Sequence, residues 1–96
     1  MDPAERLKVA AKLFTEREKL YGSNFKRVGE ALAAFFPNGV TLSSPQDFSR
    51  YHILTMMVAK LGRYAFNFDK GGHSDSIKDL SVYAAILESL DGTSKD

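Results

Sequence analysis

The sequence predicts an all-α protein, a compact bundle of four helices with short connections. Apolar residues recur every three or four positions in four stretches, and a helix start signal precedes each of them. The segment 40–42 is too short and isolated to indicate a sheet, so we expect a linker there. At 96 residues, 44% apolar and 26% charged, the chain fits one globular domain. We place that domain at residues 1–92, with a frayed tail at 93–96.

The first helix is predicted to begin after Asp2 and to end near Gly22. Asp2 is a favoured N-cap residue, and Pro3 stands at the first helical position, where a backbone N–H is not needed. The apolar residues that follow keep a helical spacing: Leu7, Ala10, Ala11, Phe14 and Tyr21. This stretch is therefore predicted to form an amphipathic helix.

The second helix is predicted over 24–36 and the third from Pro45 to about Phe66. Ser23 is suited to cap the second helix, which the segment 36–39 ends because it holds a proline and a glycine. The third helix has the clearest start signal of the chain: Ser44 followed by a proline and then Asp47, a capping box. Its length of about 33 Å is enough for the central helix of a small bundle.

The fourth helix is predicted to follow a flexible loop at 67–74 and to end at Asp91. Ser74, Asp75 or Ser76 is expected to cap it. Its apolar stripe is wide, so we expect this helix to be mostly buried and to pack antiparallel to the third.

Six aromatic residues fall at helical spacing, and we interpret them as core residues rather than as platforms for stacking nucleobases. They are Phe14, Phe25, Phe35, Tyr64, Phe66 and Tyr83.

The charge balance and the absence of cysteine exclude several classes of function. A net charge of +1 is too small for broad nucleic-acid binding, so any anion site must be local. With no cysteine, thiol catalysis and thiolate metal sites are excluded, and a reducing compartment is favoured. The acidic start and the lack of a long apolar run predict a cytoplasmic protein without a membrane span. A core this small also favours a homo-oligomer.

Two cations interrupt the apolar third helix and form the most informative polar feature of the sequence. Lys60 and Arg63 must reach solvent, pair with an acid or bind an anion. Asp79 on the fourth helix is the expected acid, and we favour a structural ion pair with it. In the alternative, both cations line a groove and hold a phosphate or an acidic partner, with Asn67 and His73 as further donors.

A metal site is a weaker alternative at the start of the fourth helix. His73, Asp75 and Asp79 would offer one imidazole and two carboxylates. Asp75 is better explained as an acid near the positive end of a helix. We therefore assign no metal, no cofactor and no catalytic residue, since no nucleophile motif is present either.

Three short patterns resemble a family of small phage and prophage proteins of uncharacterised function. They are Tyr21-Gly22-Ser23-Asn24-Phe25, Lys60-x-x-Arg63 and His73-x-Asp75-Ser76-x-x-Asp79-x-x-x-Tyr83. The resemblance covers about 21–90 and implies an accessory role in the cytoplasm of a host cell.

The helical layout is also similar, more distantly, to the MazG-like nucleotide pyrophosphohydrolases. That family binds magnesium through a Glu-Glu-x-x-Glu cluster and a later Glu-x-x-Asp, whereas the chain here reads Ser76-Ile77-Lys78-Asp79 and lacks the first cluster. The similarity implies, as the alternative function, a reduced magnesium-dependent pyrophosphohydrolase that uses Asp75, Asp79 and Glu30.

From these observations we expect a non-catalytic phage-type accessory protein that acts by binding. It would inhibit a host or defence protein, or sequester a nucleotide. The residues expected to bind the ligand or partner are Lys60, Arg63, Asn67, His73, Asp75, Asp79 and Tyr83.

Overall fold

The computed structural model describes residues 2–92 and confirms the all-α fold class. Its elements, in chain order, are α1 (Pro3–Tyr21), α2 (Asn24–Phe35), α3 (Pro45–Phe66), the short 3-10 helix η1 (Phe68–Lys70) and α4 (Ser74–Leu90). No strand occurs among the described residues. The tail expected at 93–96 lies outside them.

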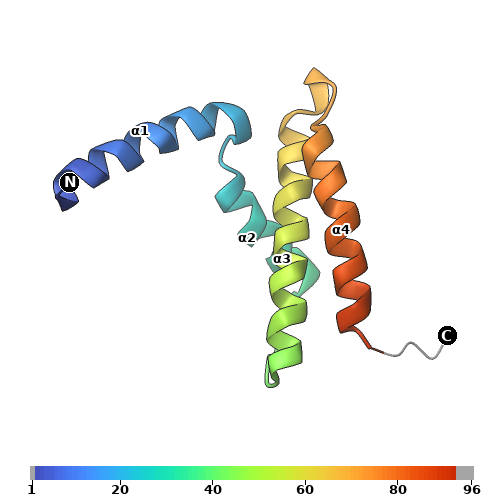
Figure 1. Cartoon of the computed structure of the whole chain (residues 1–96). Helices are drawn as coiled ribbons and strands as arrows, with labels where there is room; N and C mark the ends of the chain where they lie inside the picture. Colours follow the sequence, from blue (N-terminus) through green and yellow to red (C-terminus); the bar gives the residue numbers. More distant parts are fainter. Residues whose placement is uncertain (1, 93–96) are drawn as a thin grey trace.

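The central helix is α3, which packs against α4 along its length and against α2. Figure 1 shows α3 and α4 side by side and antiparallel, as expected, because the short connection at η1 reverses the chain. In contrast, α1 meets α3 only near its C-terminal end and projects away from the other helices. The Cα radius of gyration is 16.4 Å, compared with about 12.5 Å for a globular domain of this length.

The predicted helix starts are confirmed where local chemistry determines them. The backbone N–H of Glu5 donates to Asp2 at 2.8 Å, which caps α1. At the start of α3, the N–H of Asp47 donates to the Ser44 hydroxyl at 3.1 Å, and the carboxylate of Asp47 accepts from the N–H of Ser44 at 3.3 Å. This is the expected capping box.

The start of α4 differs from the prediction, because His73 is its N-cap. The backbone of His73 is extended (φ −146°, ψ 97°), and its Nδ1 lies 2.6 Å from the hydroxyl of Ser76. Ser76 is completely buried. Its hydroxyl therefore faces the imidazole that precedes the helix instead of serving as a cap itself.

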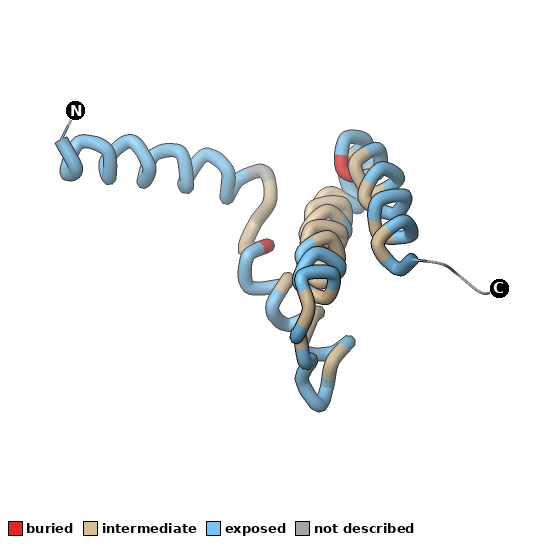
Figure 2. Tube along the Cα trace, turned by 60° about the horizontal axis from the view of Figure 1, so that its bottom comes forward, coloured by how far each residue is buried: buried red, intermediate tan, exposed pale blue. Residues whose placement is uncertain are grey.

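The apolar core of the described residues is small. Among the side chains whose burial is described, which leave out Leu20, Val58 is the only buried apolar one, at 6% exposed. Figure 2 shows α1 exposed over nearly its whole length and α4 exposed along one side. The prediction that α4 is mostly buried is therefore wrong: Val82 and Ile86 face solvent, because no helix covers the outer side of α4.

Three of the six aromatic residues predicted for the core are on the surface. Phe14, Phe25 and Phe35 are 53%, 61% and 62% exposed, whereas Tyr64, Phe66 and Tyr83 are half-buried. For Phe14 and Phe25 the reason is the direction of α1, which leaves its own apolar side and the first turn of α2 uncovered. Phe35 is the last residue of α2.

Two glycines allow close contacts where α1 and α2 meet α3. Gly22, with φ of 63°, ends α1 and lies against the ring of Phe66. Gly62 on α3 faces the side chain of Asn24, whose amide donates to the carbonyl of Ala59 at 3.0 Å. These contacts place the end of α1 beside the second half of α3.

Candidate functional site

The two cations of α3 have different partners. The Nζ of Lys60 lies 2.8 Å from a carboxylate oxygen of Asp79, and this ion pair joins α3 to α4. The side chain of Lys60 is only 13% exposed and that of Asp79 is 47% exposed. Lys60 therefore makes the structural pair that the sequence predicts.

Arg63 does not take part in that pair and stacks on an aromatic ring instead. Its guanidinium carbon lies 4.4 Å from the ring centroid of Tyr21, the last residue of α1. Within residues 2–92, no carboxylate forms an ion pair with Arg63. Its Nε is buried without a hydrogen-bond partner. The expected Arg63–Asp79 pair is thus absent, because Arg63 extends toward α1 rather than α4.

A pocket of about 280 Å³ lies where α1, α2 and α3 meet, and Arg63 lines it. We call it the Arg63 pocket. Its other lining residues are Phe14, Arg17, Glu18, Tyr21, Gly22, Asn24, Phe25, Val28 and Ala59. Aromatic rings form one part of the lining, with the centroids of Phe14 and Phe25 6.1 Å apart. The pocket therefore combines two guanidinium groups, one carboxylate and exposed aromatic faces.

Asn24 lines the same pocket and carries an unsatisfied acceptor. The residue is buried, and its Oδ1 has no hydrogen-bond partner, although its Nδ2 bonds to α3. This Oδ1 is closed off from solvent and faces Gly62 of α3, so it belongs to the contact between α2 and α3 and is not a group that a ligand can reach.

His73 borders this site, whereas Asn67 has a structural role. The imidazole of His73 packs edge-on to the ring of Tyr21, with centroids 6.0 Å apart. The Nδ2 of Asn67 donates to the carbonyl of Arg63 at 2.8 Å, and its own carbonyl accepts from the N–H of Gly72 at 2.7 Å. Asn67 thus closes the end of α3 and shapes the turn into α4.

The remaining predicted residues lie farther along α4. Asp75 is exposed in its first turn. Tyr83 is half-buried one turn after Asp79. It stands about 15 Å along the helix axis from His73. The structure therefore brings Arg63 and His73 together at Tyr21, while Lys60 and Asp79 form a separate pair.

Arg17, Asn24 and Phe25 line the Arg63 pocket but were not among the site residues predicted from the sequence. A signal for Asn24 and Phe25 was present, because the pattern Tyr21-Gly22-Ser23-Asn24-Phe25 contains four lining residues of the Arg63 pocket. No sequence pattern marked Arg17 as a site residue, since an exposed arginine on an amphipathic helix is ordinary.

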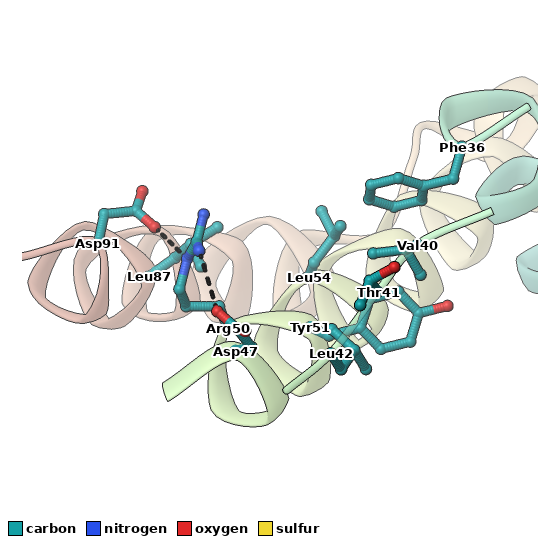
Figure 3. Close-up of a pocket in the computed structure, with 10 residues that line it drawn as sticks. All are labelled: Phe36, Val40, Thr41, Leu42, Asp47, Arg50, Tyr51, Leu54, Leu87 and Asp91. Carbon is teal, nitrogen blue, oxygen red and sulfur yellow. Dashed lines mark hydrogen bonds and ion pairs between the residues drawn. The ribbon is translucent and has the colours of Figure 1, made fainter. Parts of the chain in front are cut away.

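A second pocket, of about 220 Å³, lies at the other end of α3 and is mainly apolar. Its lining residues, drawn in Figure 3, are Phe36, Val40, Thr41, Leu42, Asp47, Arg50, Tyr51, Leu54, Leu87 and Asp91. Arg50 is already engaged there, 2.8 Å from Asp91 and 3.7 Å from Asp47. Backbone N–H groups of Ser43 and Ser44 hold the pKa of Asp47 below its ordinary value of 3.8. These charges are neutralised within the chain, which makes this pocket the weaker candidate.

No three histidine or acidic side chains of residues 2–92 are grouped closely enough to hold a metal ion. Among the same residues, no helix combines the length and the apolar composition that a membrane span requires.

Comparison with known proteins gives no family for this chain. No protein-family model matches it, and no curated protein or solved structure is significantly similar to it. The resemblances of its sequence patterns to the phage and MazG-like families therefore stay predictions.

Proposed function

We propose that the protein acts by binding a nucleotide in the Arg63 pocket, without a chemical step. The observation that carries the proposal is the state of Arg63: a guanidinium that lines a pocket and has no carboxylate partner in the described chain. Arginine binds phosphate through parallel hydrogen bonds, and a partly desolvated site strengthens them.

The rest of the lining suits the other parts of a nucleotide. Phe14 and Phe25 expose aromatic faces on which a base can stack, a contact worth about 1–3 kcal/mol per base. Arg17 supplies a second cation for the phosphates. A volume of about 280 Å³ is at the small end of ligand sites and suits a single nucleotide.

The alternative, a reduced magnesium-dependent pyrophosphohydrolase, has less support. It requires Asp79 as a metal ligand, but Asp79 is engaged by Lys60 at 2.8 Å. Glu30, the third carboxylate considered, is exposed on α2. Inhibition of a host or defence protein rests on the phage resemblance alone.

Calorimetric titration with nucleoside mono-, di- and triphosphates tests the proposal. We expect one class to bind, and Arg63→Gln to weaken its binding at least tenfold, since a charge-assisted pair is lost. Lys60→Gln is the matched control: it removes the same charge from the same helix, but from a cation held by Asp79. The nucleotide affinity of Lys60→Gln should stay within about threefold of that of the unchanged protein. The tenfold loss expected for Arg63→Gln is larger and corresponds to about 1.4 kcal/mol.

A second variant separates the base from the phosphates. Phe14→Ala should weaken nucleotide binding while leaving the affinity for inorganic pyrophosphate unchanged, because only the stacking surface is removed. The proposal is wrong if no nucleotide binds to the unchanged protein. It is also wrong if Arg63→Gln binds a nucleotide as tightly as the unchanged protein does.

A further inference from the structure

An apolar surface on α1 lacks a partner within the described chain. Leu7 is 71% exposed, and Val9, Leu13 and Phe14 on the same helix are exposed too, as is Phe25 at the start of α2. We call these five residues the α1 surface. Scattered exposed apolar residues are normal, but a group of this size on one helix marks an interaction site.

The chain exposes more accessible surface than a monomeric protein of the same mass. The accessible area is 7304 Å², whereas a monomeric protein of this mass exposes about 5,500 Å². Residues 1 and 93–96 could contribute at most about 800 Å² of the difference. The remaining excess of roughly 1,000 Å² exceeds the ~800 Å² that each partner contributes to a stable interface.

The stability of α1 itself also favours a partner. α1 has 19 residues, and its ring contacts with the rest of the chain involve its second half, at Phe14 and Tyr21. Most of the stability of a helix in a protein comes from packing of its apolar face rather than from helix propensity. A partner that covers the apolar side chains of α1 would therefore stabilise this helix.

We propose that a second copy of this chain covers the α1 surface, so that the protein is a homodimer. A second copy is available wherever the chain is made, whereas a foreign partner is not. The net charge of +1 gives two copies no strong mutual repulsion. Phe14 and Phe25 of this surface also line the Arg63 pocket, so the variants that test the dimer are placed at Leu7 and Leu13, which do not line it.

Sedimentation equilibrium and thermal melting of the purified full chain test the dimer. We expect a mass of twice 10.7 kDa. We also expect a melting temperature that rises with protein concentration, because association stabilises only the folded state. A single-chain mass at every concentration, with a melting temperature that does not change over a hundredfold dilution, would overturn the proposal.

Matched variants test whether α1 forms the interface. Leu7→Glu and Leu13→Glu should each weaken dimerisation at least tenfold, because each places a charge in an apolar contact. Lys12→Gln changes the net charge by the same amount on the polar side of α1 and should leave dimerisation unchanged. A dimer that persists in both glutamate variants overturns the assignment to α1. So does a monomer that associates only with a different protein.

Discussion

The side chain of Asn24 lies against Gly62, and it does so because Gly62 has no Cβ. The amide of Asn24 reaches past this glycine and donates to the carbonyl of Ala59, 35 positions later in the chain. The side chain of Asn24 on α2 therefore packs directly against the backbone of α3. The contact fixes where the Arg63 pocket forms, since Asn24, Ala59 and Arg63 all line it.

Gly62→Ala is therefore expected to destabilise the protein, although alanine favours a helix. The added methyl group would overlap the Oδ1 of Asn24. Such overpacking costs about 1–3 kcal/mol, more than the ~1 kcal/mol gained in helix propensity. The matched control is Gly29→Ala on α2, where nothing lies within 4 Å of the added methyl group. It should stabilise the protein by about 0.5–1 kcal/mol. Urea unfolding measures both, and equal gains in stability would contradict the close contact.

Loss of Asp79 is expected to cost more stability than loss of Lys60. Asp79→Ala leaves the largely buried ammonium of Lys60 without its partner, a change worth about 1–3 kcal/mol. Lys60→Met keeps the volume and removes the buried charge, so its cost should be smaller. Asp75→Ala, on the exposed first turn of the same helix, is the control and should cost no more than about 1 kcal/mol. If Asp79→Ala and Asp75→Ala have the same melting temperature, the Lys60–Asp79 ion pair does not stabilise the protein.

The carboxyl of Asp47 is expected to make the stability fall in acid. Its folded pKa lies below 3.8 because the backbone N–H groups of Ser43 and Ser44 donate to the charged form. The resulting stabilisation is present above pH 3.8 and is lost as the pH falls through the folded pKa. Melting temperatures measured from pH 6 down to about pH 2 should therefore drop less in Asp47→Asn than in the unchanged protein. Asp69→Asn, on η1, serves as the control for removing a carboxylate, and parallel curves for all three proteins would contradict the prediction.

Tyr21 is expected to anchor the end of α1 through its ring rather than its hydroxyl. Arg63 stacks on the ring and His73 meets it edge-on. Tyr21→Phe keeps both contacts and should change the free energy of unfolding by less than about 0.5 kcal/mol. Tyr21→Leu removes them and should cost about 1–2 kcal/mol. A loss in Tyr21→Phe equal to that in Tyr21→Leu would assign the effect to the hydroxyl instead.

The features that were predicted correctly from the sequence are those that nearby residues determine. The cap at Asp2 and the capping box at Ser44 depend on side chains three positions away, so their chemistry is visible in the sequence. The antiparallel arrangement of α3 and α4 follows from a connection too short to allow another.

The features that were missed depend on distant parts of the chain. Helical spacing showed that Phe14 belongs to an apolar stripe, but not that the stripe would lack a covering helix in one chain. Lys60 and Arg63 are three residues apart and share a helix face. Spacing therefore could not decide which of them meets Asp79. The choice depends on Tyr21, which reaches Arg63 only through the placement of α1.

The residues of α3 that contact the end of α1 come late in the chain, and this position affects the order of folding. α1 is synthesised first, but its anchors, Arg63 and Phe66, are on α3 and emerge only after α2 is complete. α3 and α4 are neighbours in sequence, and such local pairings form fastest. We therefore expect the hairpin of α3 and α4 to form before α1 has a surface to join. The helix made first is then the last to be packed.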